Sequence, residues 1–183
     1  MQEILKKEIS LEENTRIGLF GGSFNPAHEW HFQVANHACN ILSLDKVIWL
    51  VSPHNPLKDK KTLYALKDRL DSAKKIGNSS NFIVTDIEKK LKTQYSIDTI
   101  SIFQKTFTSK KFIWIMGSDN AAQIKQWKDW KQILKKIAIA IYPRATHPLS
   151  EIEKMLEKYS NKIDEGNHKD LMSLETPCFT FIN

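Results

Sequence analysis

A pair of glycines followed by two histidines is the part of this sequence best suited to chemistry. Gly21 and Gly22 end an apolar run, and His28 and His31 follow in a helical pattern. Glycines let a ligand approach the backbone, and the first turn of a helix offers unpaired N–H groups and a positive dipole end to an anion. Imidazoles at positions i and i+3 share one helical face and can donate to phosphate oxygens. The pattern predicts a phosphate-binding turn, with a structural histidine pair as the alternative.

The spacing of these residues differs from that of the common nucleotide and metal motifs. The glycine turn lacks both the dinucleotide fingerprint and the Gly-Lys-Ser/Thr ending of a P-loop. The histidines of His28-Glu29-Trp30-His31 are three residues apart, whereas the zinc-protease pattern places them four apart and needs further ligands. We therefore expect no metal site here.

Two further polar segments follow apolar runs and carry candidate charged groups. Lys58 closes a loop that contains Pro53 and Pro56. Its ammonium could neutralise charge during phosphoryl transfer, or it could be an ordinary surface lysine. Asp119 follows Gly117 closely and could accept hydrogen bonds from a ribose, cap the next helix, or do both.

Tyr95, Ser96 and Trp127 are candidates for contacts with an organic substrate. Ser96 begins a helical pattern after Tyr95, so it would ordinarily cap that helix, and it could also touch a substrate. Trp127 and Trp130 lie three residues apart and by default pack in the core. An exposed indole is also a natural platform for a flat heteroaromatic ring.

The elements that must position these residues alternate regularly along the chain. Apolar, β-rich runs alternate with helical patterns, which predicts an α/β fold: a Rossmann-like, doubly wound parallel sheet of five to six strands with helices on both faces. The expected strands are 17–20, 47–51, 82–85, 112–116, 137–142 and 179–182. Ligands of such sheets bind beyond the carboxyl ends of the strands. Three of the polar segments follow expected strands, so we expect them to share one site.

Helical periodicity is expected in the segments that connect these strands. The first helix would bury Phe32, Ala35, Ala38 and Leu42, and the others would cover 63–77, a segment from Ser96, 119–136 and 149–158. We expect a polar N-terminal extension over residues 1–15 and one domain over residues 16–183, since a chain of 183 residues can bury a sizeable core.

Composition excludes several classes of partner. The net charge is +6, but only three of the 27 basic residues are arginine and the lysines are interspersed with acids, so we expect no nucleic-acid partner. Apolar runs are too short to span a membrane and the N-terminus is too charged for a signal peptide. We therefore expect a cytoplasmic protein without membrane contact. Cys39 and Cys178 have no metal or redox spacing and are expected to be buried thiols, and the oligomeric state stays open.

These segments resemble those of the bacterial nicotinate mononucleotide adenylyltransferases, a family of the nucleotidylyltransferase superfamily. The superfamily signature is a glycine-rich turn followed by (His or Thr)-x-Gly-His. The likeness spans about residues 16–183, and its more specific motifs are Asn55-Pro56-Leu57-Lys58, Tyr95-Ser96-x-Asp98-Thr99, Met116-Gly117-Ser118-Asp119-Asn120, Trp127-x-x-Trp130 and Glu175-Thr176-Pro177.

The resemblance implies an activity and a role for each candidate residue. The activity is adenylyl transfer from ATP, bound with Mg²⁺, to nicotinate mononucleotide, which yields nicotinic acid adenine dinucleotide and pyrophosphate in NAD biosynthesis. His31 would contact the α-phosphate, with His28 and Lys58 on the leaving pyrophosphate. The other implied ATP contacts are Gly21, Gly22, Ser23, Phe24, Gly117 and Asp119, the last on the ribose. Tyr95, Ser96 and Trp127 would surround the pyridine ring.

The sequence departs from the family pattern in two places. Trp30 stands where the signature has glycine, beside the expected ATP sugar and base, so we expect Trp30→Gly to raise ATP affinity. Family members also continue into an Ile-Ser-Ser-Thr-x-x-Arg-like segment, and we expect this chain, which stops at Asn183, to lack it and to turn over slowly. Two alternatives therefore remain: a nucleotide-binding module with impaired or no turnover, and a related transferase with another phosphate acceptor.

Overall fold

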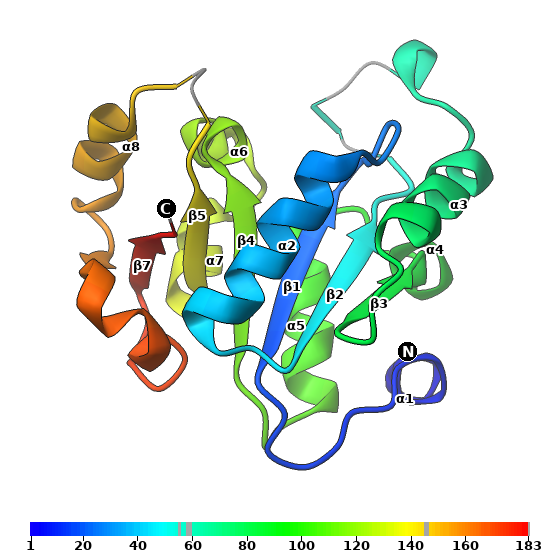
Figure 1. The fold of residues 1–183 in the computed structure, drawn as a ribbon, viewed down its shortest axis with the longest axis horizontal. Coiled ribbons are helices and arrows are strands. Elements are labelled where there is room, and N and C mark those ends of the chain that lie inside the picture. The colour runs from blue at the N-terminus through cyan, green and yellow to red at the C-terminus, as the bar shows by residue number, and fades with distance from the viewer. Residues whose placement is uncertain (55, 58–59, 145–146, 183) are drawn as a thin grey trace.

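In the computed structural model, which describes residues 1–54, 56–57, 60–144 and 147–182, seven parallel strands form one sheet (Figure 1). Their order is β3-β2-β1-β4-β5-β7-β6, and the order reverses between β1 and β4, where doubly wound sheets open a crevice. The strands are β1 (Ile17–Gly22), β2 (Lys46–Val51), β3 (Phe82–Thr85), β4 (Phe112–Gly117), β5 (Ala138–Tyr142), β6 (Asn161–Lys162) and β7 (Cys178–Phe181).

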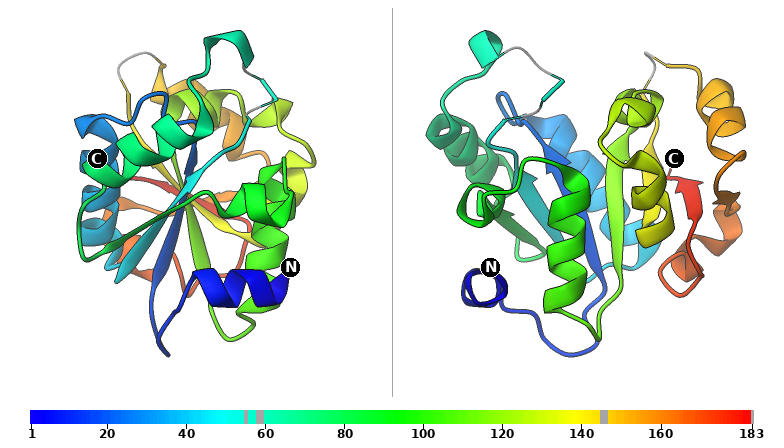
Figure 2. Two further views of the ribbon diagram at one scale, coloured as in Figure 1. Left: turned by 90° about the vertical axis from the view of Figure 1, so that its right-hand side faces the viewer. Right: turned by 180° about the vertical axis from the view of Figure 1, so that it is seen from behind.

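Helices cover both faces of the sheet, as expected for this fold class (Figures 1 and 2). One face carries α2 (Glu29–Leu42) and α3 (Leu66–Ile76), and the other carries α1 (Gln2–Glu8), α4 (Ile87–Leu91), α5 (Ser96–Thr106) and α7 (Trp130–Lys136). The remaining helical segments are α6 (Ser118–Ala122), α8 (Leu149–Leu156) and the 3-10 turns η1 (Lys60–Thr62), η2 (Ile124–Gln126) and η3 (Glu165–Asp170). The Rossmann-like fold is thereby confirmed.

The described part of the sheet has one strand more than the five to six that we expected. The six expected strands all form, and the addition is β6, in which Asn161 pairs with Cys178 and Lys162 with Phe179. Both residues of β6 are exposed. A two-residue polar strand has no apolar alternation by which a sequence could reveal it.

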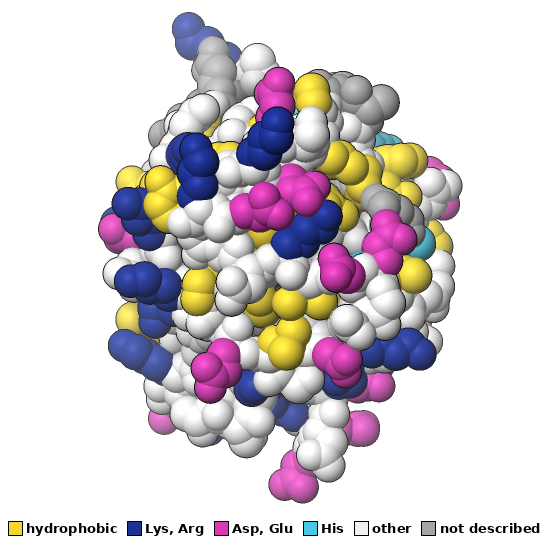
Figure 3. All heavy atoms as spheres, turned by 90° about the vertical axis from the view of Figure 1, so that its left-hand side faces the viewer, with side chains coloured by type: hydrophobic (Ala, Val, Ile, Leu, Met, Phe, Trp, Pro, Cys, Tyr) yellow, Lys and Arg dark blue, Asp and Glu magenta, His cyan; other side chains and the backbone are white. Residues whose placement is uncertain are grey.

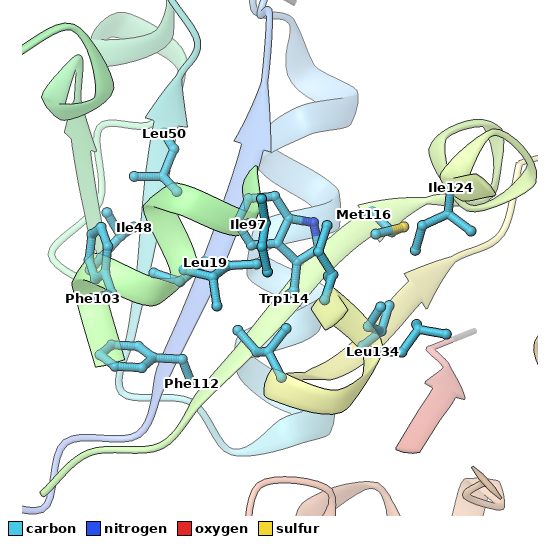
Figure 4. Close-up of a cluster of buried hydrophobic side chains, with 14 of the residues drawn as sticks. Leu19, Ile48, Leu50, Ile97, Phe103, Phe112, Trp114, Met116, Ile124 and Leu134 are labelled. Atoms are coloured by element: carbon cyan, nitrogen blue, oxygen red, sulfur yellow. The ribbon is translucent and has the colours of Figure 1, made fainter. Parts of the chain in front are cut away.

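Alternating strand residues build a separate apolar layer on each face of the sheet. Leu19 and Trp114 face the layer beneath α5, where Ile97 and Phe103 pack against them (Figure 4). Phe20 and Trp49 face the opposite layer, beneath α2 and α3. Because the sheet is buried on both faces, its strand ends are a rigid support for the loops that leave them.

The N-terminal segment, expected as a polar extension, packs on the sheet domain. Helix α1 contacts α4 and α5, and the side chains of Leu5 and Ile9 are almost fully buried in the core. Lys90 on α4 forms an ion pair with Glu8. The boundary at residue 15 stays a prediction, but residues 2–9 are part of the same packed body.

The helical region expected over 119–136 is broken into three pieces. Helix α6 and η2 end before Trp127, and α7 begins at Trp130 after Asp129, whose φ of 51° is left-handed. The two tryptophans therefore do not share a helix. The ring centroids of Trp127 and Trp114 lie 6.3 Å apart, whereas those of Trp130 and Tyr159 lie 4.9 Å apart.

The surface charges, the lengths of the helices and the two cysteines bear on the predictions made from composition. On the face that includes α8, Lys and Arg side chains gather mainly along the left edge of the view, and Asp and Glu lie mainly across the rest of the face, with hydrophobic side chains among them (Figure 3). None of the described helices is long and apolar enough to cross a membrane. Cys39 and Cys178 are buried free thiols, as expected.

Candidate functional site

A cleft of about 460 Å³ opens at the carboxyl ends of β1 and β4. Its walls come from the turn after β1, the loop after β2, the segment before α5 and the segment after β4. Every predicted site residue except Lys58 lines it: Gly21, Gly22, Ser23, Phe24, His28, His31, Tyr95, Ser96, Gly117, Asp119 and Trp127. Lys58 lies outside the described residues, so its placement stays untested.

Gly21 and Gly22 are the last two residues of β1, and protein rings lie close to both. A Cβ on Gly21 would lie 2.8 Å from the indole of Trp114, and one on Gly22 would lie 3.2 Å from the ring of Phe24. The left-handed residue of the turn is Phe24, with φ of 45°, rather than a glycine. Phe24 is buried and stacks on Trp49 at 5.2 Å, and this packing offsets a backbone strain of about 1 kcal/mol.

His28 and His31 stand side by side at the start of α2. Their ring centroids are 4.0 Å apart, and His31 also packs against Phe24 at 5.0 Å. The backbone N–H of His28 donates to Nδ1 of His31 at 3.2 Å. Because Nδ1 accepts this hydrogen bond, the neutral imidazole of His31 carries its hydrogen on Nε2. His31 is thereby prepared as a hydrogen-bond donor at the cleft.

Gly117 and Asp119 lie where β4 gives way to α6, beside an arginine that sequence reasoning did not single out. Asp119 is in the first turn of α6 and makes no capping hydrogen bond, so its expected capping role is not seen. Its carboxylate instead pairs with Arg144 at 3.4 Å. Arg144 also lines the cleft. Its ion pair with Asp119 could not be predicted from the sequence, because the two residues lie far apart in it.

The second end of the cleft is aromatic. Tyr95 is the N-cap of α5 and Ser96 is its first residue, without a capping side-chain hydrogen bond. The ring of Trp127 packs edge-on against that of Trp114. The ammonium of Lys128 stands 4.6 Å from the Tyr95 ring centroid and 3.7 Å from Asp98, so a flat ring entering here would meet aromatic walls and a cation.

A buried carboxyl group, Glu88 on α4, also lines the cleft and was missed in the sequence. Thr99 on α5 donates its hydroxyl hydrogen to Glu88 at 2.8 Å, and the Thr93 hydroxyl lies 3.0 Å from the same Thr99 oxygen, which can accept from it. Burial raises the pKa of Glu88 to about 7, although the hydrogen bond from Thr99 lowers it. The pair joins α4 to α5 and so fixes the intervening segment that contains Tyr95.

Trp30 is placed differently from our expectation. Its indole is 37% exposed and meets Tyr142 edge-on at 5.2 Å, and it is not among the residues that line the cleft. The structure therefore does not support the expected steric block by this side chain. The ring covers the end of β5 instead.

We accordingly expect Trp30→Gly to leave the affinity for ATP within about twofold of the parent, and to lower stability by about 0.5 to 1 kcal/mol through the glycine alone. Calorimetric titration with a non-hydrolysable ATP analogue and urea unfolding measure the two effects. Trp30→Ala is the control, because it removes the indole without the helix penalty of glycine. Tighter ATP binding by both variants would restore the steric hypothesis.

Several buried polar atoms in the cleft wall have no partner in the protein. Among the described residues they include Ser23 Oγ, Trp114 Nε1, Asp119 Oδ1 and Arg144 Nε. Buried polar atoms in folded proteins are nearly always hydrogen-bonded. A ligand or an ordered water in the cleft could supply hydrogen-bond partners for these four atoms.

The profile of the cytidylyltransferase-like family matches residues 19–172 of this sequence. The chain belongs to that family. Curated relatives described as probable nicotinate-nucleotide adenylyltransferases include one from Caulobacter, 45% identical over 70% of this chain and 68% of the relative. Another, from Bradyrhizobium, is 41% identical over 91% of this chain and 88% of the relative.

Solved structures agree with the fold. The nicotinic acid mononucleotide adenylyltransferase of Plasmodium falciparum, in its complex with NaAD, superimposes with a TM-score of 0.69 at 19% identity, covering 93% of this chain and 75% of that one. Its complex with APC gives a TM-score of 0.67 over the same shares. The sheet and its surrounding helices therefore have the same fold as these solved structures.

Proposed function

We propose that this chain transfers the adenylyl group of ATP to nicotinate mononucleotide, forming nicotinic acid adenine dinucleotide and pyrophosphate in NAD biosynthesis. The observation that carries the proposal is convergence: segments that lie far apart in the sequence, and that the sequence alone predicts to bind substrate, line one cleft. The names of the relatives support the same reaction.

The reaction is a direct displacement. A phosphate oxygen of the mononucleotide forms a bond to the α-phosphorus of ATP, while the bond from that phosphorus to the oxygen bridging the β-phosphate breaks. Pyrophosphate leaves with the bonding electrons, and no covalent enzyme intermediate forms. The protein contributes by holding two anions in line and by aiming donors at the charge that develops between them.

The phosphate end of ATP is assigned to the turn after β1. In this assignment His31 Nε2 donates to the α-phosphate, and His28 with Lys58 contacts the leaving pyrophosphate. The backbone of residues 21–24 and the N-terminus of α2 hold the remaining phosphate oxygens. Gly117 and Asp119 lie at the ribose.

The mononucleotide is assigned to the aromatic end of the cleft. Tyr95, Ser96 and Trp127 surround its pyridine ring, which a flat indole or phenol ring can stack on.

Mg²⁺ is proposed to arrive with ATP. The described residues contain no group of three or more His, Cys, Asp or Glu side chains suited to a metal ion. Mg²⁺ commonly keeps several waters and uses substrate phosphates as ligands, so it does not require such a group. When bound, it neutralises charge on the phosphates.

The cytoplasmic location of the protein also stays a prediction.

A pyrophosphate-release assay tests the proposal. The chain is supplied with MgATP and, in separate reactions, nicotinate mononucleotide, nicotinamide mononucleotide, phosphopantetheine or a sugar-alcohol phosphate. Release with nicotinate mononucleotide at the highest kcat/KM supports the proposal. Preference for another acceptor identifies a related transferase, and nucleotide binding by calorimetry without release from any acceptor identifies a binding module.

A further inference from the structure

A buried arginine on α3, outside the cleft wall, joins three of the segments that form the site. Arg69 is only 2% exposed. Its Nη1 donates to the carbonyls of Ser23 at 2.6 Å and Ser52 at 2.8 Å, its Nη2 to Pro53 at 3.1 Å, and its Nε to Tyr64 at 3.0 Å. One guanidinium therefore fixes the turn after β1, the segment after β2 and the segment before α3.

The hydrogen bond to Ser23 determines the direction of the next N–H group. In a trans peptide the C=O and N–H point in opposite directions, and the bond between Ser23 and Phe24 is not one of the cis bonds of this chain. Holding the Ser23 carbonyl toward Arg69 turns the Phe24 N–H away from it. Ser23 and Phe24 line the cleft and Arg69 does not, so this N–H is directed to the cleft side.

The same helix also holds the far end of the turn. Ser72 on α3 accepts a hydrogen bond from the Ala27 N–H at 3.2 Å and donates to the Arg69 carbonyl at 2.9 Å. Between these points Asn25 accepts from the Tyr64 N–H at 2.8 Å. The turn from Ser23 to Ala27 is therefore anchored at both ends before any ligand arrives, which is the preorganisation that anion-binding donors require.

Arg69 also brings a positive charge to this region. Within the described residues, its partners are carbonyl oxygens and it has no ion pair. A cation that is not neutralised by a carboxylate lowers the energy of an anion on the other side of the turn.

We propose that Arg69 is a positioning residue for the triphosphate of ATP: it orients the N–H groups of the turn after β1 and supplies a positive charge behind them. The inference rests on the proposed function, because it takes the bound anion to be ATP. It requires no contact between Arg69 and the ligand.

Calorimetric titration with inorganic tripolyphosphate tests the role without any turnover. We expect Arg69→Met to weaken binding by about tenfold or more, as loss of charge-assisted hydrogen bonds does. Arg69→Lys keeps the charge on a single nitrogen that cannot reach all three segments, so it should lose about threefold. If Arg69→Met does not fold, Arg69→Lys carries the test.

Arg16 provides the matched control. Its guanidinium also donates to main-chain carbonyls, those of Leu42, Ser43 and Lys169, at the opposite end of β1. Arg16→Met should lower the melting temperature and leave tripolyphosphate affinity unchanged. Wild-type affinity in a folded Arg69→Lys variant, or an equal loss in Arg16→Met, would overturn the proposal.

Steady-state kinetics give a second, independent readout. An orienting role predicts a higher KM for ATP in Arg69→Lys and an unchanged KM for nicotinate mononucleotide, whereas a merely structural role would lower only the active fraction. Failure of the wild-type chain to release pyrophosphate while it binds tripolyphosphate would remove the proposed function and the assignment of the anion to ATP, and would leave the orienting role of Arg69 toward a polyphosphate standing. Absence of tripolyphosphate binding by the wild type would overturn the inference itself.

Discussion

Replacing His31 by Asn is expected to lower kcat for pyrophosphate release by about 100-fold, the usual cost of losing one donor aimed at transition-state charge. The Asn carbonyl can still accept the hydrogen bond that the His28 N–H now gives to Nδ1 of His31. The start of α2 should therefore keep its structure while the donor at Nε2 is lost.

The complementary variant and a neighbouring histidine sharpen this prediction. His31→Gln places an amide N–H near the position of Nε2, so it should retain more activity than His31→Asn. His37, on the same helix, packs on Tyr142 at 5.5 Å and does not line the cleft. His37→Asn should leave kcat unchanged, and a kcat for His31→Asn close to that of His37→Asn would exclude the assigned role.

The second large effect is a fall in the free energy of unfolding with rising pH, caused by the ionisation of Glu88. Glu88 has its pKa raised to about 7 in the folded protein from an ordinary value of 4.5. A carboxyl group with a raised pKa favours the folded state fully below pH 4.5, and this contribution is lost as the pH rises through 7. Between pH 5 and pH 8 the loss amounts to about 2 to 3 kcal/mol in the free energy of unfolding.

Glu88→Gln should remove this loss. Its amide oxygen can accept the hydrogen bond from Thr99, and it carries no charge at any pH. Urea unfolding at pH 5 and pH 8 should show the wild type losing about 2 to 3 kcal/mol more than Glu88→Gln. Glu153→Gln, at an exposed ion pair with Lys162, is the control and should follow the wild type. Parallel pH profiles of the wild type and Glu88→Gln would contradict the prediction.

The sequence predicted those parts of the molecule that depend on local pattern. Continuous apolar runs identified the central strands because strands buried on both faces have no polar positions. The site loops were found because polar and glycine residues interrupt these runs at one edge of a parallel sheet. The break at Asp129 was not predicted because its left-handed backbone, which Gly, Asn and Asp adopt more readily than other residues, occurs inside an otherwise continuous helical pattern.

Long-range contacts explain the site residues that were missed. Arg69 is one of three arginines in the chain, yet its carbonyl partners lie up to 46 residues away, and carbonyls carry no sequence signal. Glu88 stands in a run of charged residues typical of an exposed helix, and the local pattern does not show that α4 packs against α1 and β2. The ring contact between Trp30 and Tyr142 joins α2 to β5, and a contact between residues so far apart in sequence leaves no local sequence signal.

The short strand at the end of the sheet has a consequence for behaviour in concentrated solution. An open sheet edge exposes backbone donors and acceptors to which another molecule can add a strand. At this edge the protein offers only the two residues of β6, and Lys162 is held there by Glu153 at 2.6 Å. A second molecule would find a ladder too short to template growth and a charged side chain in its path, so this border should resist fibrillar association.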